Sequence, residues 1–238
     1  MSGEATVAAT PQWHEFAARG EVATTLAEHI AAALARAIAH RGTAFLAVSG
    51  GRTPADMFAA LSKEDVDWTK VALTLIDERN VPESSPRSNA ALVRSHLLQD
   101  RAAAARFVPL YQGIDAIEAA AGQASKALAG LPWPLDIAVL GMGDDGHTAS
   151  FFPDAADLGA LLAPHNTAVV MPVHAASAGE PRLTLPLARI VEAGWIAVQI
   201  EGNDKKAVLE AALAPEGNRP ISAVFRQGRK PIDIYWAP

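Results

Sequence analysis

The sequence predicts an α/β fold of three layers, in which helices cover both faces of a mostly parallel, Rossmann-like sheet. Two observations carry this prediction. Short apolar runs alternate along the chain with segments whose apolar residues recur at helical spacing, and glycine-rich or polar turns follow several of the apolar runs. The chain has 238 residues, half of them hydrophobic. That is enough to bury one full core, so we expect a single domain over residues 1–238.

The first half of the chain predicts alternating helices and strands. Residues 1–12 are small and polar, and we expect them to be frayed. A long helix over 21–40 follows, and Gly42 ends it. The elements expected next, in chain order, are a strand over 44–48, a helix over 54–61, a strand over 71–76, a helix over 90–98 with Ser88 or Asn89 as its cap, a short strand over 107–110 and a helix over 114–128.

The second half predicts a central strand in the apolar run that begins at Leu135, since its length and flanking glycines suit a strand buried in a parallel sheet. Residues up to 164 are expected to form a loop with a short helix. The elements expected after it are a strand over 167–171, a short helix after Pro186, a strand over 195–200, a helix over 207–213 and a closing strand over 232–236. Right-handed crossovers would bring the carboxyl ends of the strands to one shared crevice.

The composition narrows the class of protein. There is no cysteine, which excludes disulfides and cysteine zinc sites, and no charged-then-apolar leader, so we expect a cytoplasmic protein. The net charge of −6 and the lack of a Lys/Arg block argue against nucleic-acid binding, and the apolar runs are too short to span a membrane. The histidines show no metal-ligand spacing. A small anionic substrate fits this charge if a few placed cations meet it.

A glycine turn follows the strand over 44–48 and leads into the next helix. Its residues are Ser49, Gly50, Gly51, Arg52, Thr53 and Pro54. Proline at a first helical turn, with glycines before it, leaves an exposed helix N-terminus, whose free N–H groups and positive dipole end bind phosphate. The alternative is a plain strand-to-helix turn, because Gly-Gly turns are common.

A second interpretation of this turn is a nucleophile elbow. The pattern Ala47-x-Ser49-x-Gly51 approximates that motif, and Ser49, Asp77 and His147 follow the chain order of a hydrolase triad. The elbow normally has glycine where Ala47 stands. Only one expected strand precedes the serine, which is too few to place it at the centre of such a sheet. The sequence therefore favours the phosphate-binding turn.

The turn after the central strand contains groups suited to proton transfer. Three glycines let the chain turn sharply and present Asp144, Asp145 and His147 together at the carboxyl end of the strand. A neighbouring carboxylate fixes the tautomer of a histidine and raises its basicity, so this cluster suits general acid–base catalysis. The alternative is a histidine that only makes loop hydrogen bonds.

The same three glycines match the spacing of the dinucleotide-binding fingerprint, as Gly141-x-Gly143-x-x-Gly146. That motif packs a pyrophosphate on a helix N-terminus, whereas the two acids in this turn would repel it. The next expected strand, over 167–171, ends in Met-Pro without the acid that binds the ribose. We therefore expect no dinucleotide here.

Three cations lie close to the ends of expected elements. Arg79 follows the strand over 71–76 beside two acids, and either faces the ligand crevice or forms a surface ion pair with them. Arg182 precedes the short helix near Pro186 and is a candidate second cation. Lys205 lies at the start of an expected helix, where a cation is unfavourable for the helix dipole, and this conflict indicates a functional role.

Taken together, these segments resemble one protein family. The segments are Ser49-Gly50-Gly51, Asp77-Glu78-Arg79-x-Val81-Pro82 with Ser88-Asn89, Gly141-Met142-Gly143-x-Asp145-Gly146-His147-Thr148-Ala149-Ser150-x-Phe152-Pro153, Arg182-x-Thr184 and Gly202-x-x-Lys205. They are similar to the motifs of the family of glucosamine-6-phosphate isomerases and 6-phosphogluconolactonases, and they occur in the right order between residues 44 and 206.

The lactonase branch of this family is the better match. The resemblance implies the glucosamine-6-phosphate isomerase fold and the hydrolysis of 6-phospho-D-glucono-1,5-lactone to 6-phospho-D-gluconate in the oxidative pentose phosphate pathway, without metal or cofactor. It implies His147 as general base, oriented by Asp145 or another nearby acid, with Asp77 orienting water or sugar hydroxyls. The residues implied to bind substrate are Ser49, Gly50, Gly51, Arg52, Arg79, Arg182 and Lys205, with Lys206 as an alternative to Lys205.

The isomerase branch is the main alternative. It shares the Ser-Gly-Gly turn, Asp77 and the Asp-Gly-His motif, but it continues with Ile-Ala-Phe-Asn-Glu-Pro, so that Phe152 stands here in place of its glutamate. Arg79 also stands where the isomerases usually have an aromatic residue. A non-catalytic sugar-phosphate sensor is a third class, but no helix-turn-helix segment precedes residue 44. The expected partner is therefore a small sugar-phosphate lactone, and we expect a monomer or homodimer.

Overall fold

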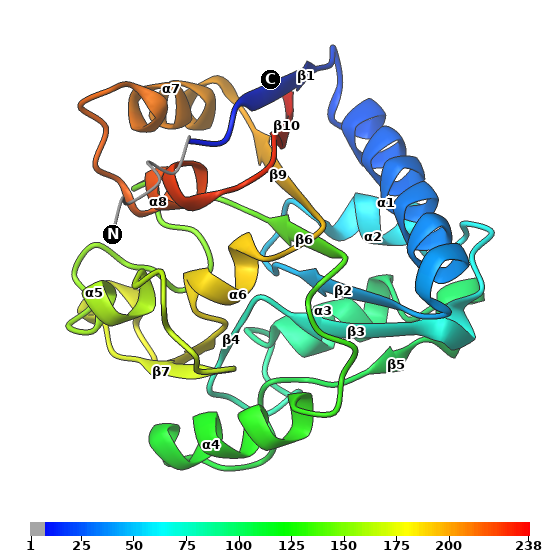
Figure 1. Cartoon of the computed structure of the whole chain (residues 1–238), viewed down its shortest axis with the longest axis horizontal. Coiled ribbons are helices and arrows are strands. Elements are labelled where there is room, and N and C mark those ends of the chain that lie inside the picture. The colour runs from blue at the N-terminus through cyan, green and yellow to red at the C-terminus, as the bar shows by residue number, and fades with distance from the viewer. Residues whose placement is uncertain (1–7) are drawn as a thin grey trace, which may run out of the picture.

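The computed structural model describes residues 8–238 and confirms the expected α/β class. Its centre is a seven-stranded sheet in which neighbouring strands are parallel. Figure 1 shows these strands crossing the molecule from β1 at the top to β5 at the lower right. Their order is β1 (Pro11–Glu15), β10 (Ile232–Ala237), β9 (Trp195–Glu201), β6 (Ile137–Leu140), β2 (Ala44–Val48), β3 (Val71–Leu75) and β5 (Arg106–Phe107).

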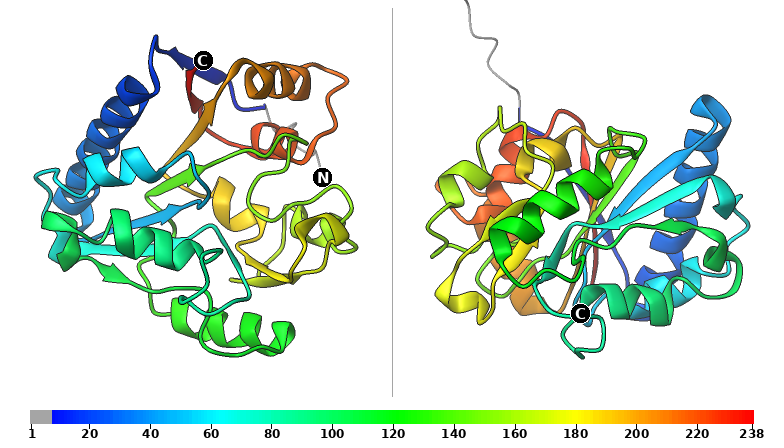
Figure 2. Two further views of the ribbon diagram at one scale, coloured as in Figure 1. Left: turned by 180° about the vertical axis from the view of Figure 1, so that it is seen from behind. Right: turned by 90° about the horizontal axis from the view of Figure 1, so that it is seen from below.

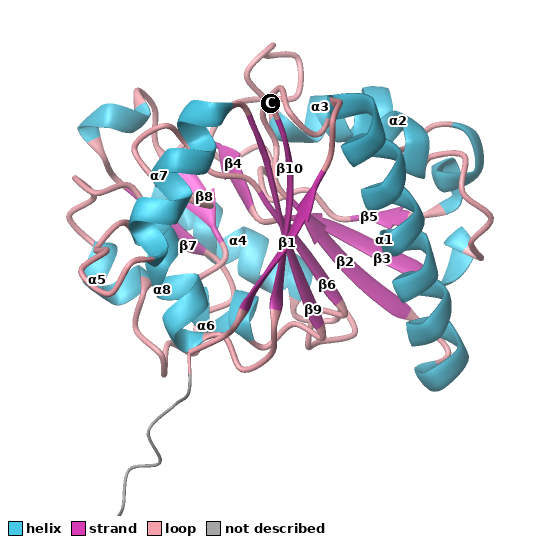
Figure 3. Cartoon of the chain, turned by 90° about the horizontal axis from the view of Figure 1, so that it is seen from above, coloured by secondary structure: helices cyan, strands magenta, loops and turns pink. Residues whose placement is uncertain are grey.

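Helices cover both faces of this sheet and form the two outer layers (Figure 3). One face carries α1 (Arg19–Arg41), α2 (Ala55–Leu61) and α3 (Asn89–His96), and the opposite face carries α6 (Leu187–Val191), α7 (Asn203–Leu213) and α8 (Pro220–Gln227). Two further helices are α4 (Ile117–Leu128) and α5 (Leu158–Leu161), and the short 3₁₀ helices are η1 (Trp68–Lys70), η2 (Asp100–Ala104) and η3 (Ala176–Ala178). The three-layer arrangement expected from the sequence is therefore confirmed.

A second, smaller sheet lies on the side of the molecule away from α1 (Figure 2). Its antiparallel strands run in the order β4 (Asp77–Arg79), β8 (Arg182–Thr184) and β7 (Met171–Val173). The sequence analysis predicts neither β4 nor β8, because strands of three residues show no usable period. The strand expected over 167–171 is wrong except at Met171. The Ser125 hydroxyl accepts a hydrogen bond from the Val170 amide at 3.1 Å and donates one to the Val170 carbonyl at 3.3 Å. Both backbone groups of Val170 are therefore used by a side chain, and pairing of β7 with β8 begins at Met171.

Two more elements differ from expectation. Pro11 and Gln12 were expected to be frayed, but they belong to β1 and pair in parallel with Ile232 and Asp233; the rest of the expected frayed segment up to residue 7 lies outside the described residues. A short, partly exposed strand has no clear alternation, and its partner is far away in the sequence. The sequence analysis also misses α8, although Pro220 occupies the first helical turn, a position that proline favours.

The strand expected over 107–110 is wrong except at Phe107, because β5 ends there and the Thr74 hydroxyl donates to the next carbonyl, that of Val108, at 2.8 Å. The remaining expected helices and strands are confirmed, with shifted ends. The strand over 44–48 agrees at both ends, and its five residues are buried. Ser88 is the cap of α3, since its side chain accepts a hydrogen bond from the Ala91 amide. Gly42 ends α1 with a left-handed φ of 81°, which glycine adopts without steric cost.

The sequence was expected to contain no apolar segment long enough to span a membrane, and helix α1 corrects this expectation about length. Its 23 residues reach a mean hydropathy of 1.3 over an 18-residue window, so length and composition alone would allow it to span a membrane. Its apolar residues are instead used inside the fold, where α1 packs against α2 and the large sheet (Figure 1). The buried residues of α1 are Val22, Ala23, Leu26, Ala27, Ile30, Ala31, Ala33 and Leu34. This is the pattern of a core helix.

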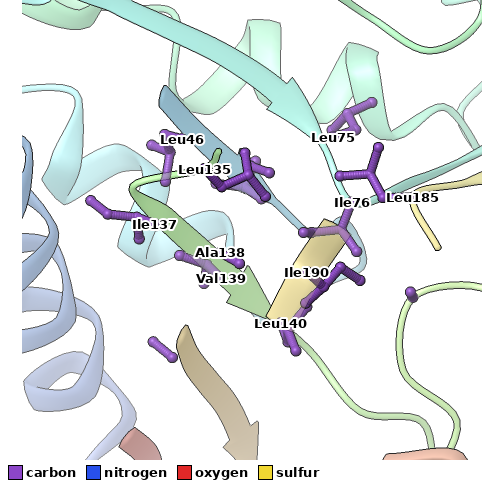
Figure 4. Packing of buried hydrophobic residues seen from close by; sticks show 14 of the residues in the cluster. Leu46, Leu75, Ile76, Leu135, Ile137, Ala138, Val139, Leu140, Leu185 and Ile190 are labelled. Carbon is purple, nitrogen blue, oxygen red and sulfur yellow. The ribbon is translucent and has the colours of Figure 1, made fainter. Parts of the chain in front are cut away.

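The hydrophobic core lies along the central strands. Strands β2, β3 and β6 are buried over their full lengths. Figure 4 shows apolar side chains from these strands packing in one region with Leu185 and Ile190, which come from the segment around α6. Because β2, β6 and β9 are parallel, their carboxyl ends lie along one edge of the sheet. The loops that carry the expected site residues begin at that edge.

Candidate active site

A cavity lies at the carboxyl ends of the central strands and gathers residues that are far apart in sequence. It is lined by the loop 49–54 after β2, by β4, by the segment 139–143 with 147–149, and by single residues from α3, β8, β9 and α7. The predicted site residues on its wall are Ser49, Gly50, Gly51, Arg52, Asp77, Arg79, His147, Arg182 and Lys205. Asp145 is not on the wall but contacts one of these residues, His147.

The His147 ring is held by Asp145. Nδ1 of the ring lies 2.5 Å from Oδ1 of Asp145, and the same oxygen accepts the His147 amide at 3.0 Å. Burial acts to raise the pKa of the Asp145 carboxyl, but the hydrogen bonds from His147 outweigh it, so this pKa lies below its usual value. An ionised carboxylate beside Nδ1 keeps a proton on that nitrogen and leaves the lone pair on Nε2. The sequence left open which acid orients His147, and the geometry selects Asp145.

Two glycines make this arrangement possible. A Cβ at Gly143 would lie 2.1 Å from Cε1 of His147, so the ring occupies the space that a side chain would need. Gly146 has a φ of 82°, and the Arg219 side chain packs against it while the Arg219 guanidinium donates to the Asp145 carbonyl at 2.6 Å. The turn therefore holds the acid and the imidazole in one geometry. The next helix, α5, begins only at Leu158, so the turn lacks the helix N-terminus that a dinucleotide fingerprint requires.

The ring of Phe152 packs between two site residues. Its centroid lies 4.5 Å from that of the His147 ring, and the guanidinium carbon of Arg182 lies 5.4 Å from its centroid. Phe152 is 5% exposed, so an apolar surface supports the imidazole on this side. Position 152 is where the isomerase pattern would place a glutamate, and in this chain it contacts the histidine without offering a carboxylate.

Asp77 belongs to a different hydrogen-bond network from His147. The Ser150 hydroxyl donates to Oδ2 of Asp77 at 2.6 Å, and the carboxylate is 7% exposed at the cavity wall. Among residues 8–238, the Ser49 hydroxyl has no hydrogen-bond partner. The residues of the suggested nucleophile elbow therefore do not form a relay, because the imidazole is paired with Asp145 instead.

The loop 49–54 is closely packed against α3. A Cβ at Gly50 would lie 1.9 Å from Oδ1 of Asn89, so only glycine fits there without moving the amide. The side-chain nitrogen Nδ2 of Asn89 in turn donates to the backbone carbonyl of Asp77 at 2.9 Å. Gly51 has a φ of 95°, a conformation that favours glycine. The two glycines thus let the loop pass close to Asn89 and line the cavity.

Arg79 and Arg182 face each other across two strands. They are register partners in β4 and β8, an arrangement in which like charges repel. Arg182 is 7% exposed; burial lowers the pKa of its guanidinium, and Asp77 opposes that shift. Nη2 of Arg182 donates to the Ala178 carbonyl at 2.9 Å, while Nη1 of Arg79 donates to the Arg87 carbonyl. The pair places two positive charges on one wall, with Asp77 and Glu180 beside Arg182, and an anion in the cavity would reduce the repulsion between the two guanidinium groups.

The structure separates the two candidate lysines. Nζ of Lys205 donates to the Met142 carbonyl at 2.7 Å, and this side chain lines the cavity. Lys206 instead forms an ion pair with Glu15 at 2.7 Å and lies over the Trp236 ring at 4.1 Å. Of the two lysines, Lys205 is therefore the one that lines the cavity. In residues 8–238, no cluster of three or more histidine and acidic side chains has the arrangement of a metal site.

Glu78 is a residue at the site whose role the sequence analysis misses. Its carboxylate is fully buried and accepts hydrogen bonds from the Arg79, Asn89 and Ala90 amides at 2.8, 2.8 and 2.7 Å, and from the Ser88 hydroxyl at 3.1 Å. It thereby joins β4 to the start of α3 and fixes two residues of the cavity wall, Arg79 and Asn89. No local pattern marks this role, since the two segments meet only in the folded chain.

Stability should depend on pH through Glu78. Burial raises the pKa of its carboxyl above the usual 4.5, although the amides of Asn89, Ala90 and Arg79 oppose the shift. Between the unfolded and the folded pKa, the folded chain binds more protons, so the free energy of unfolding falls as pH rises through that window. We expect Glu78→Gln to remove this contribution in urea unfolding from about pH 4 to 8. Identical pH slopes for both proteins would contradict the assignment.

Comparison with known proteins gives one consistent picture. The family model described as glucosamine-6-phosphate isomerases/6-phosphogluconolactonase matches residues 17–236. A 6-phosphogluconolactonase of Mesorhizobium japonicum is 56% identical over 238 residues, covering 100% of each chain. One from Pseudomonas aeruginosa is 46% identical over 220 residues, covering 92% of this chain and 91% of the relative. A solved structure of a 6-phosphogluconolactonase from Shewanella baltica has a TM-score of 0.91 at 36% identity and covers 99% of this chain and 100% of that one.

Proposed function

Because the chain belongs to the family of glucosamine-6-phosphate isomerases and 6-phosphogluconolactonases, we propose that it hydrolyses 6-phospho-D-glucono-1,5-lactone to 6-phospho-D-gluconate in the oxidative pentose phosphate pathway. It is an enzyme of this family, and its relatives over the full length are named 6-phosphogluconolactonases. The observation that carries the proposal is the pairing of His147 with Asp145 at the wall of a cavity that also holds Arg79, Arg182 and Lys205.

In the proposed mechanism, His147 is the general base. Nε2 takes a proton from a water molecule while the water oxygen attacks the lactone carbonyl, which gives a tetrahedral oxyanion. The bond from the carbonyl carbon to the ring oxygen then breaks, and the imidazolium returns the proton to that oxygen. Asp145 stabilises the imidazolium between the two steps. The new carboxylic acid then loses its proton to the solvent, which gives the carboxylate of 6-phospho-D-gluconate; one water is consumed and no other reactant is needed.

The substrate phosphate is proposed to bind against the loop 49–54. Arg79, Arg182 and Lys205 supply positive charge from three different elements, which supports this placement. Charge-assisted hydrogen bonds are the strong ones, and arginine matches phosphate in a bidentate geometry. The remaining carboxylate, Asp77, would orient the attacking water or the sugar hydroxyls. These four groups would hold the lactone so that its carbonyl faces His147.

The decisive test is proton release from freshly generated 6-phosphogluconolactone, measured with metal-free protein against the spontaneous rate. Glucosamine-6-phosphate is assayed in parallel. Acceleration of lactone opening alone is the expected result. Formation of fructose-6-phosphate from the amino sugar, without faster lactone opening, would place the chain in the isomerase branch. Binding of both compounds without turnover would overturn the enzymatic proposal in favour of a sensor.

Replacing Arg79 with alanine should act mainly on KM. If the guanidinium binds the phosphate equally in the ground and transition states, its loss raises KM by roughly 10- to 100-fold with little change in kcat. Steady-state lactone hydrolysis measures both constants. Arg94→Ala is the matched control, since this exposed arginine pairs with Glu83 outside the cavity. A fall in kcat at unchanged KM would remove Arg79 from the phosphate site.

We also propose the domain organisation, the cellular location and the partners of the protein. The core cluster runs from Ala9 to Ala237, which supports one domain over residues 1–238. The absence of cysteine favours the cytoplasm, and the net charge of −6 disfavours nucleic acid and anionic membranes as partners. For the assembly, we propose a monomer or a homodimer.

A further inference from the structure

Several buried polar atoms at the cavity have no partner within the described chain. The atoms on wall residues are Ser49 Oγ, Arg79 Nε, Arg182 Nε and Gln199 Oε1. A buried polar group without a hydrogen bond costs free energy, and a bound ligand with matching groups would satisfy the atoms that lie around the cavity. The Nε atoms of Arg79 and Arg182 are hydrogen-bond donors on positively charged groups, so they suit an anion. Gln199 is uncharged and needs a different explanation.

Gln199 lies in β9, in a strand that is otherwise apolar from Trp195 to Ile200, and it is 4% exposed. Its Nε2 donates to the Thr53 carbonyl at 3.3 Å, so the side chain reaches from the sheet to the loop 49–54. A carbonyl oxygen can only accept a hydrogen bond. The amide must therefore turn its NH₂ group toward Thr53, and this fixes the orientation of the whole side chain.

With the NH₂ group used, Gln199 offers its carbonyl oxygen, Oε1, as the remaining group. That oxygen is a hydrogen-bond acceptor, and it is the atom without a partner. Phosphate oxygens are also acceptors, so a dianionic phosphate group would gain nothing from Oε1. A hydroxyl group can donate to it. The residues of this wall thus include donors, on Arg79 and Arg182, and an uncharged acceptor without a partner, on Gln199, besides the Asp77 carboxylate.

We propose that Gln199 is a specificity-determining residue whose Oε1 accepts a hydrogen bond from a hydroxyl of the sugar part of the ligand. The proposal rests on the proposed function, because it requires a polyhydroxy phosphate in the cavity. It assigns the cationic side chains to the phosphate and the glutamine to the carbon chain beside it. A site that pairs a buried acceptor with a ligand hydroxyl rejects the analogue that lacks this hydroxyl, since the acceptor is then left unsatisfied.

The first experiment compares two probes, 6-phosphogluconate and inorganic phosphate, by calorimetric titration of the wild type and Gln199→Met. Methionine has a similar length and is unbranched, but it has neither the amide donor nor the acceptor. We expect Gln199→Met to weaken 6-phosphogluconate by roughly 5- to 100-fold and to leave phosphate within about twofold. Equal weakening of both probes would mean that the amide only holds Thr53 in place, and no change in either would also overturn the proposal.

Gln227→Met is the matched control. Gln227 repeats the local pattern of Gln199, since its Nε2 donates to the Leu162 carbonyl at 2.8 Å and its buried Oε1 has no partner in the described part of the chain. It lies in α8, outside the cavity. This variant should bind both probes as the wild type does. Circular dichroism of the two variants reports whether either has lost its fold.

A second experiment identifies the hydroxyl by turnover. The phosphogluconolactones lacking the hydroxyl at C2, C3 or C4 are compared with the parent lactone by kcat/KM. The wild type should discriminate against one of them by roughly 5- to 100-fold, and Gln199→Met should lose that discrimination. The proposal fails if the variant discriminates as strongly as the wild type. Failure of the proposed function is separate, because the wild type would then not accelerate lactone opening at all.

Discussion

Replacing His147 with alanine should lower kcat by roughly 10²- to 10⁴-fold with a modest change in KM. Nε2 is the atom that would remove the proton from water, and Asp145 holds the ring so that this nitrogen carries the lone pair. Alanine leaves the cations of the cavity in place, and these are the proposed partners of the lactone phosphate. Steady-state kinetics, corrected for spontaneous lactone opening, measure the effect.

His174→Ala is the matched control for this substitution. His174 is an exposed histidine whose ring also meets a carboxylate, with Nε2 at 3.1 Å from Oε1 of Glu118, but it lies outside the cavity. Its loss should leave kcat and KM unchanged. A His147→Ala enzyme with the wild-type kcat would show that another group removes the proton.

Gly143→Ala should lower kcat by roughly 10²-fold, although the new methyl group need not touch the substrate. Its Cβ would lie 2.1 Å from Cε1 and 2.3 Å from Nδ1 of His147, and 2.9 Å from Oδ1 of Asp145. The imidazole must move, and a displacement of about 1 Å in a catalytic group can cost this much. KM should change little, because Arg79 and Arg182, the arginines proposed to bind the phosphate, are not displaced.

Gly141→Ala provides the comparison within the same turn. Gly141 also lines the cavity, but no atom lies within 4 Å of the position that its Cβ would take, and neither glycine has a positive φ. This variant should therefore keep its kcat. Equal kcat values for the two variants would mean that the position of the ring does not limit the reaction.

Local patterns were sufficient for much of the fold. The strand over 44–48 is a short apolar run between turn residues, and those features act within a few residues of each other. The elements that the sequence missed depend on distant partners. Asp77 in β4 pairs with Thr184 in β8, and Pro11 in β1 pairs with Ile232 in β10; nothing in the local sequence of β4, β8 or β1 marks it as extended. Such strands form because a partner is present in the folded chain, so periodicity cannot reveal them.

The candidate site shows the same division. The glycine turn at His147 predicted the association of acid and imidazole, because Asp145 is only two residues away. Which of the two lysines lines the cavity depends on the direction in which each side chain projects from α7, and adjacent positions on a helix project in different directions. Lys205 reaches the Met142 carbonyl and Lys206 reaches Glu15. Gln199 carried one weak signal, a polar residue in an apolar strand. Its meaning came from Thr53, which lies 146 residues away.

The position of β1 has a consequence for the order in which the protein can be completed during synthesis. His14 in β1 is 219 residues away from its partner Asp233 in β10, and the two strands pair along five residues. A ribosome delivers β1 early, but its hydrogen-bonding partner emerges only after nearly all of the other described strands have been made. The edge strand must therefore wait, and closing so long a loop carries a large entropic cost. We infer that β1, the first of the described strands along the chain, is among the last to dock.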